Sequence, residues 1–326
     1  MTSAPSIWAL IGARPGDNNQ VLALAEALGL PYEVKPLRYN RWRHLGPQRL
    51  GATLRSVTSD CRAAVGGDPP DLIIAAGHRS VPVVQFLRRS SGRRMRSVHI
   101  GYPRIPPERF DLVIATPEYP VPDSGNVMRI PFALTRNIPA EPFTALLAPR
   151  RLLILGGPTL YWRFDRSVLL GAVKCLIDAA ADNGGSLIVV ASPRTPSNIF
   201  ADVERTLRDT EVPTLAVPVG GAPSYAALLA GADQLFVTAD SVAMVSDAII
   251  TRKPVGMVPI VPTALGSAYS AMLGSGIRMR PRDLRFFWKA LAEEKLVGTV
   301  DQPRSGSIPD LNAGVVARVT GLLSLG

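Results

Sequence analysis

Short apolar runs alternate with longer amphipathic stretches along the whole chain. The first half holds six such runs, "IWALIGA", "YEVKPL", "DLIIAAG", "RSVHIG", "DLVIAT" and "NVMRIPF". The second half holds five, "RLLILGG", "SLIVVAS", "TLAVPV", "QLFVTA" and "VGMVPI". Strands that alternate with helical lengths of chain are typical of parallel α/β sheets. We therefore predict an α/β protein with one open sheet in each half.

A proline-rich stretch separates the two sets of strands. Residues 133–151 contain Pro139, Pro142 and Pro149 and show no regular hydrophobic period, as expected of a connector. A chain of 326 residues also exceeds the size at which a single core stops growing. We predict an N-terminal domain over residues 1–145 and a C-terminal domain over residues 146–326. The helical patterns at 280–299 and 311–326 are expected to pack back across both domains.

The composition is that of a globular protein. Hydrophobic residues make up 47% and charged residues 19%, and no apolar run approaches the roughly 20 residues of a membrane-spanning helix. The first apolar segment has no basic region before it, so it does not resemble a secretory signal. Cys61 and Cys175 lie in unrelated contexts and predict neither a disulfide framework nor a metal cluster. We expect a cytoplasmic protein, with peripheral contact at the inner membrane left open.

The net charge of +10 is concentrated in the first half. Residues 1–148 hold 18 Lys and Arg against 11 Asp and Glu, a balance of +7. The basic runs are 38–49, where Tyr39 and Trp42 lie among arginines, and 88–96. Such patches bind anionic lipid or phosphorylated substrates, or they are simply solvated faces. No helix-turn-helix or zinc-finger pattern supports nucleic-acid binding.

Glycine-rich and polar residues follow several predicted strands, where ligands of open α/β sheets bind. The first such segment is "GARPGDNNQ", from Gly12 to Gln20, ahead of the helical pattern "VLALAEAL". Asp17 or Asn18 is a candidate cap for that helix. The segment matches neither a P-loop nor a GxGxxG fingerprint. A ligand role and a capped structural turn are both compatible with this pattern.

Two further turns in the second half share this character. "LILGGP" places Gly156 and Gly157 after a strand, and "ASPRTP" places Ser192 and Arg194 after the next one. Small residues with free backbone amides would suit phosphate or sugar oxygens, with Arg194 adding charge. Ordinary turn chemistry also explains each of them.

The segment "TADSVAMVSDAII", from Thr238 to Ile250, carries the most specific signal. It predicts a strand end, a cap at Asp240 or Ser241, and a helix over 242–251 that buries residues 242, 245 and 249. The amino end of that helix is a candidate anion site. Asp247 lies about 9 Å further along the helix axis, near the reach from a diphosphate to its ribose. A nucleotide-sugar pocket accounts for this pattern, and a surface carboxylate beyond a solvent-facing cap is the alternative.

Five segments together resemble the elongated-mitochondria (mitochondrial fission factor) family, and they cover nearly the whole chain. They are "GARPGDNNQ", "PRIPPERFDLVIATPEY", "LILGGPTLYW", "SPRTP" and "VTADSVAMVSDAIITRKPV". That family is similar to GT-B glycosyltransferases. The resemblance implies two Rossmann-like domains facing across a cleft and a nucleotide-sugar donor site in the C-terminal domain. Asp247 departs from the expected pattern, which has the longer glutamate there.

The resemblance also implies the residues of the donor site, all of which follow strands of the second sheet. They are Gly156, Gly157 and Thr159 at the diphosphate, Ser192, Arg194 and Thr195 at the nucleotide, Ser241 and Met244 at the phosphates, and Asp247 at the ribose.

For the reaction itself, GT-B enzymes of this kind are usually inverting and use neither a cofactor nor a metal. The nucleotide sugar is then a substrate. Asp17 is the first candidate base and His78 the second, although a lone histidine after a strand is commonly structural. Arg14 and Arg79 are candidates for holding an anionic or lipid-linked acceptor.

Three other functions remain as alternatives. The first is a non-catalytic scaffold with the GT-B architecture that recruits partners in membrane or envelope organisation. A nucleotide-sugar epimerase ranks next, because the chain has only three histidines. DNA binding ranks last.

Overall fold

The structure, a computed structural model, describes residues 5–92, 95–136, 138–273, 282–308 and 310–324. It divides the chain into two compact units. The first consists of 1–137 together with 309–326, and the second of 138–308. The division therefore lies eight residues before the predicted one, and the last helix belongs to the first unit. Arg93 and Arg94 of the basic run and Arg280 and Pro281 of a predicted helical stretch lie outside the described residues.

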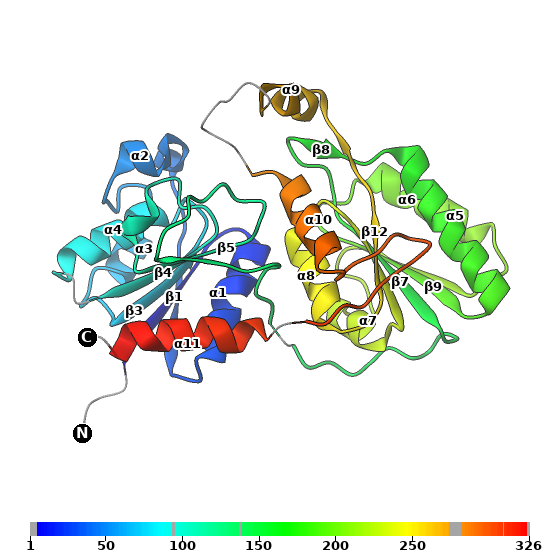
Figure 1. Cartoon of the computed structure of the whole chain (residues 1–326), viewed down its shortest axis with the longest axis horizontal. Coiled ribbons are helices and arrows are strands. Elements are labelled where there is room, and N and C mark those ends of the chain that lie inside the picture. Colours follow the sequence, from blue (N-terminus) through cyan, green and yellow to red (C-terminus); the bar gives the residue numbers. More distant parts are fainter. Residues whose placement is uncertain (1–4, 93–94, 137, 274–281, 309, 325–326) are drawn as a thin grey trace. The chain divides into compact units, whose positions relative to one another are not determined.

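The first unit is built on a six-stranded sheet whose strands all run parallel, in the order β2-β1-β3-β4-β5-β6 (Figure 1). The strands are β1 Ile7–Ile11, β2 Tyr32–Pro36, β3 Leu72–Ala76, β4 Arg96–Ile100, β5 Leu112–Ala115 and β6 Val127–Arg129. All six correspond to predicted runs. Because successive side chains of a strand point to opposite faces, Ile7 and Ala9 pack into one core and Trp8 and Leu10 into another.

Helices cover both faces of this sheet. They are α1 Pro15–Ala27, α2 Gly46–Leu50, α3 Ser59–Ala64, α4 Val81–Ser90 and α11 Leu311–Ser324, with the 3-10 turns η1 Arg41–Leu45 and η2 Pro107–Arg109. Helix α11 packs beside α1 (Figure 1), and Val315 and Val319 bury it against the core that holds Ile7 and Ala9. Helices α3 and α4 supply Cys61 and Val84 to the core of the other face. The C-terminal helix thus completes the first unit.

The second unit contains a five-stranded sheet, also entirely parallel, in the order β10-β9-β7-β11-β12. Its strands are β7 Arg150–Leu155, β9 Ser186–Ala191, β10 Thr214–Val217, β11 Gln234–Thr238 and β12 Val255–Val258, all of them predicted. A small antiparallel pair, β8 Trp162–Arg163 with β13 Val261–Pro262, was not predicted. Strands of two residues leave no hydrophobic period in a sequence, which explains why they were missed.

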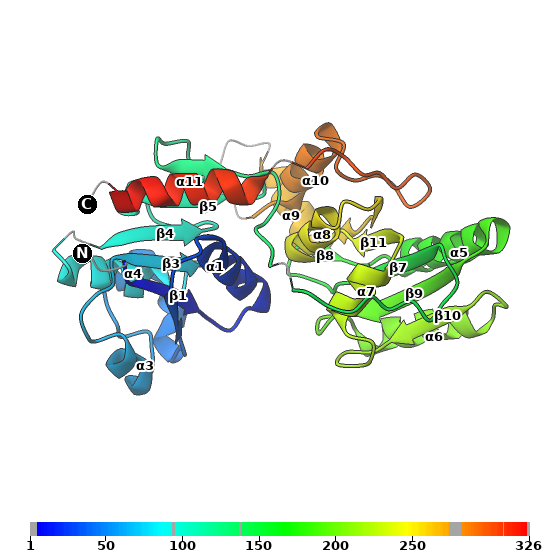
Figure 2. The same ribbon diagram turned by 90° about the horizontal axis from the view of Figure 1, so that it is seen from below.

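The helices of the second unit are α5 Arg166–Asn183, α6 Ser197–Arg208, α7 Tyr225–Gly231, α8 Val242–Ile250, α9 Ala264–Leu273 and α10 Leu284–Glu293. Helices α5 and α6 pack against one face of the sheet through Leu169, Val173 and Val203 (Figure 2). Helices α7 and α8 contact β7 and β11. No helix of the described residues is both long enough and apolar enough to span a membrane.

The start of α1 differs from prediction, whereas the start of α8 agrees with it. Helix α1 begins at Pro15, so Asp17 and Asn18 lie in its first turn and neither caps it. Proline suits a first helical position because its fixed φ is helical and its missing N–H needs no partner there. The Asn18 amide instead bonds the backbone N–H and C=O of Gly12, at 2.7 and 2.8 Å. At α8 the cap is Ser241, one of the two predicted residues, and its hydroxyl accepts a hydrogen bond from the amide of Met244 at 3.4 Å.

A histidine in the centre of the first sheet gives the stability of this unit a pH dependence. His99 on β4 is fully buried, its ring lies 4.9 Å from that of Phe110, and neither ring nitrogen bonds a described group. Burial lowers the pKa of His99 to about 3, with a smaller contribution from His78. The unfolded chain therefore binds this proton first, and stability is lost as the pH falls below the unfolded pKa of about 6.5.

We expect His99→Phe to remove this acid sensitivity. Between pH 7.5 and pH 5 the wild type should lose about 2 kcal/mol more unfolding free energy than the variant does. Urea denaturation at the two pH values measures the loss of unfolding free energy in each protein. The contribution of His78 is present in both proteins and cancels in the comparison. Equal losses in the two proteins would show that His99 takes up its proton without unfolding.

Candidate functional site

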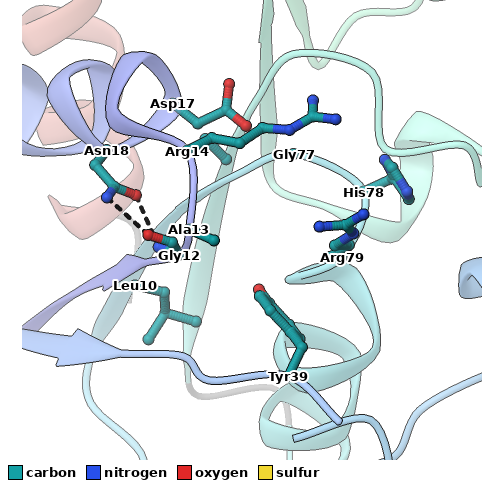
Figure 3. A pocket seen from close by; sticks show the side chains of 11 residues that line it. Leu10, Gly12, Ala13, Arg14, Asp17, Asn18, Tyr39, Gly77, His78 and Arg79 are labelled. Carbon is teal, nitrogen blue, oxygen red and sulfur yellow. Dashed lines mark hydrogen bonds between the residues drawn. The ribbon is translucent and has the colours of Figure 1, made fainter. Parts of the chain in front are cut away.

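A small pocket opens at the carboxyl ends of β1 and β3 in the first unit (Figure 3). Its volume is about 30 Å³, which suits one small group of a ligand better than a whole sugar. The residues that line it are Leu10, Gly12, Ala13, Arg14, Asp17, Asn18, Tyr39, Ala76, Gly77, His78 and Arg79. The four residues predicted for catalysis and acceptor binding in this half of the chain, Arg14, Asp17, His78 and Arg79, are all among them.

Two strand-to-helix turns place these side chains. Arg14 is the residue before α1, and Asp17 lies in the first turn of that helix. Gly77 follows β3 with a φ of +71°, a conformation that glycine adopts without strain. A Cβ at Gly77 would lie 2.9 Å from an Asp17 carboxylate oxygen. Glycine at this position thus provides both the turn and the room for Asp17.

His78 is half-buried beside this turn. Burial is the main cause that lowers its pKa, to about 4, and the positive charges of Arg104, Arg79 and Arg14 lower it further. The imidazole is therefore neutral at pH 7 and can accept a proton or a hydrogen bond. A base held neutral among arginines is the arrangement expected where an acid-base group meets an anionic ligand.

Positive charge dominates the mouth of the pocket. Figure 3 shows the guanidinium groups of Arg14 and Arg79 directed toward the same space, with Asp17 beside Arg14 and the Tyr39 hydroxyl pointing inward. Desolvation, together with the charges of Arg14 and Arg43, lowers the pKa of Arg79. Burial raises the pKa of Tyr39, which keeps its proton and remains a donor. Repulsion among these arginines is relieved when an anion binds between them.

In the second unit, the buried carboxylate of Asp240 joins the turns that carry the predicted donor residues. One of its oxygens accepts from the backbone amide of Gly157 at 2.9 Å and from the Arg194 guanidinium at 2.7 Å. The other accepts from the hydroxyl of Thr238 at 2.7 Å. The Asp240 side chain is only 2% exposed, whereas that of Arg194 is 42% exposed. This carboxylate therefore ties together the turns that follow β7, β9 and β11.

The expectation of free amides at Gly156 and Gly157 is wrong. The Gly156 amide donates to the Thr238 hydroxyl at 2.8 Å, and the Gly157 amide donates to Asp240. A Cβ on Gly156 would lie 2.2 Å from both Asp240 oxygens, and one on Gly157 would lie 2.0 Å from the carbonyl of Arg194. These glycines admit a protein carboxylate and a protein backbone, which explains their conformation without any ligand.

Two predicted donor residues have internal hydrogen bonds as well. The Thr195 hydroxyl bonds the carbonyls of Leu155 and Gly156, at 2.9 and 2.7 Å, and accepts from the Ser192 amide. The Thr159 hydroxyl accepts from the amide of Trp162 at 3.1 Å. These contacts fix the loop conformations at the carboxyl edge of the sheet. They place the loops next to the start of α8 but do not by themselves indicate a ligand.

Asp247 has a partner that the sequence did not predict. It is half-buried on α8, and the hydroxyl of Tyr225, the first residue of α7, lies 3.4 Å from its carboxylate. Burial raises the pKa of Asp247 to about 6, against the opposing effect of the hydrogen bond from Tyr225. Its charge therefore changes near neutral pH, a property common at ligand-binding positions.

The sequence also missed Tyr39 and Asp240 as members of these sites. Tyr39 follows β2, so its place after a strand was a usable signal. Asp240 was considered only as a helix cap. Local spacing cannot reveal its contacts with Arg194, which lies 46 positions earlier in the chain, and with Gly157, which lies 83 positions earlier.

The contact of Asp240 with Gly156 leads to a test of stability. We expect Gly156→Ala to destabilise the protein by about 1–3 kcal/mol, because the added Cβ collides with a buried carboxylate that has no room to move. Gly171→Ala on α5 is the matched control, since its Cβ meets no atom within 4 Å. Alanine in a helix interior should raise stability there by about 0.5–1 kcal/mol. Urea unfolding of both variants measures their stability. Equal stability of Gly156→Ala and Gly171→Ala would refute the packing argument.

By sequence, the chain matches a known protein family. The pattern described as Mitochondrial fission ELM1 matches residues 15–272. Mitochondrial fission protein ELM1 of Arabidopsis thaliana is 26% identical over an alignment of 242 residues that covers 64% of this chain and 56% of that protein. The match thus spans little more than half the length of the plant relative.

Solved structures share the fold at low sequence identity. UDP-GlcNAc 2-epimerase from Methanocaldococcus jannaschii has a TM-score of 0.55 at 12% identity, covering 98% of this chain and 100% of that one. The same archaeal enzyme in complex with UDP-GlcNAc and UDP has a TM-score of 0.50, with the same identity and coverage. At this identity the likeness establishes the architecture alone. The chain belongs to the Mitochondrial fission ELM1 family and has a GT-B-like fold with two Rossmann-like α/β units.

Proposed function

We propose that this protein binds a nucleotide sugar through its second unit and transfers the sugar to a phosphorylated or lipid-linked acceptor held by its first unit. The observation that carries the proposal is the pocket of the first unit. Two acid-base candidates, Asp17 and His78, and two arginines converge there from turns more than sixty residues apart.

The pocket suits a phosphate group of the acceptor. Arg14 and Arg79 provide charge-assisted hydrogen bonds, and the amino ends of α1 and α4 lie next to these arginines in the sequence. Within this arrangement the neutral His78 adds no further positive charge. A hydroxyl next to the bound phosphate would then lie near Asp17.

The proposed binding site for the nucleotide-sugar donor lies at the start of α8. The amides of its first turn have no partner within the helix, apart from the Met244 amide that Ser241 caps, and the helix dipole favours an anion there. Arg194 offers an exposed guanidinium beside the Gly157 turn. The archaeal epimerase of the same fold was solved with UDP-GlcNAc and UDP, and we extend that ligand class to this chain.

The proposed chemistry is a single displacement. Asp17, or His78 as the second candidate, takes the proton of the acceptor hydroxyl as its oxygen forms a bond to the anomeric carbon of the sugar. The bond from that carbon to the diphosphate oxygen breaks, and the electron pair leaves with the nucleoside diphosphate. The anomeric centre is inverted. Helix amides and Arg194 neutralise the leaving charge, so the mechanism we propose requires no metal or cofactor.

One observation favours the scaffold as the second candidate. Asp240 already neutralises Arg194 and accepts from the Gly157 amide. A protein that kept the fold for recruitment alone could retain such an internal ion pair. Under this alternative the protein binds partners in membrane organisation, as the division role in the name of its plant relative suggests.

Binding and turnover of nucleotide sugars distinguish the two candidates. We expect one of the uridine, guanosine, cytidine or adenosine diphosphate sugars to raise the melting temperature, because it binds only the folded protein. Asp17→Asn should keep that shift and lower transfer or hydrolysis about 10²–10⁴-fold. The exposed Asp209→Asn serves as the control. Absence of stabilisation by every sugar nucleotide tested would favour the scaffold. Wild-type turnover by Asp17→Asn would show that Asp17 is not the base.

The raised pKa of Asp247 implies that donor binding depends on pH. Below about pH 6 the carboxyl is protonated and loses acceptor capacity for two ribose hydroxyls, so affinity should fall about tenfold between pH 7 and pH 5. Asp247→Asn should bind weakly at both values. Calorimetry with the stabilising nucleotide sugar and its 2′-deoxy analogue measures this effect. An equally steep pH dependence in Asp247→Asn would assign it to another group.

A further inference from the structure

One surface of the first unit combines exposed apolar side chains with unneutralised arginines. It is formed by the segment from Tyr39 to Ser59, which leaves the carboxyl end of β2 and includes η1 and α2. This segment contains four arginines and no Asp or Glu. Arg41, Arg43, Arg49 and Arg55 are all exposed, and none forms an ion pair with a carboxylate of the described residues.

The surface contains a hollow with a mixed lining. Its volume is about 400 Å³, and its lining residues are Trp42, Leu45, Arg49, Leu50, Thr53 and Arg55. Trp42 is 46% exposed and Leu45 39% exposed, and both lie on η1. The guanidinium of Arg41 lies 5.4 Å from the centre of the Trp42 ring. Three apolar side chains thus share one depression with two guanidinium groups.

We propose that this hollow docks the protein on an anionic phospholipid surface. Arginines attract the negative headgroups, while tryptophan and leucine enter the boundary between headgroups and acyl chains, where amphipathic rings are favoured. The surface suits nucleic acid less well. Trp42 is the sole exposed tryptophan, tyrosine or phenylalanine of the segment, and leucine side chains do not stack on bases.

The same segment leads into the pocket of the first unit. Tyr39, at its start, lines that pocket, and the charge of Arg43 acts on Arg79 inside it. A surface that sits on lipid through Trp42 therefore brings the arginines of the pocket near the headgroups. Lipid docking is independent of sugar transfer, because a scaffold could use it equally well.

Sedimentation of the full-length protein with vesicles tests the proposal. We expect binding to phosphatidylcholine vesicles that contain phosphatidylglycerol, little binding to phosphatidylcholine alone, and loss of binding as salt rises. Arg49→Gln with Arg55→Gln should weaken binding about fivefold for each arginine. Trp42→Ala with Leu45→Ser should weaken it roughly tenfold, because less apolar surface leaves water.

Matched variants of the second unit control for charge and apolarity. Arg163→Gln with Arg208→Gln removes two exposed arginines, and Leu160→Ser with Phe286→Ala removes two exposed apolar side chains. Both should bind vesicles like the wild type. All four double variants should stay folded, because every substituted side chain is partly or fully exposed. Equal binding to neutral and anionic vesicles, equal losses in the controls, or a preference for single-stranded RNA over anionic vesicles would each overturn the proposal.

Discussion

Every strand of the two large sheets runs parallel to its neighbours, and both candidate sites follow from that constraint. Parallel strands end at one edge of the sheet, so the turns after them meet although they are distant in sequence. In the first unit this edge gathers Arg14, Asp17 and Tyr39 with His78 and Arg79. In the second it gathers the turns after β7, β9 and β11. The chemistry of each unit is therefore decided by its turns.

The two edges are organised differently. In the first unit, burial and the charges of neighbouring arginines lower the pKa values of His78 and Arg79, a perturbation that is common at binding sites. In the second unit, the protein supplies its own anion, Asp240, and the polar groups around it are paired. Such pairing stabilises the loops, since a buried carboxylate without partners would be costly. Because the amides of Gly156 and Gly157 are already paired, a bound phosphate would contact the start of α8 and Arg194 and not the glycine turn.

The arginines of the first half of the chain fall into two groups. Some arginines are structural, such as Arg88 and Arg96, which pair with Asp111, and Arg136, which pairs with Glu26. Others line the pocket or the hollow beside Trp42, and Arg49 and Arg55 of that hollow form no ion pair with a carboxylate of the described residues. A net charge of +10 therefore overstates the charge available for binding, and position decides which arginines contribute.

The sequence by itself determined the eleven strands of the large sheets and the helix after Ser241, because hydrophobic periodicity is a local property of the chain. Only the tertiary structure decided which partner each polar group takes. Asp240 was predicted only as a candidate helix cap, and its contacts with Gly157 and Arg194 appear only in the structure. The hydrogen bond between Tyr225 and Asp247 was likewise not predicted. A single sequence records spacing along the chain, whereas hydrogen bonds between distant turns depend on packing, which spacing does not encode.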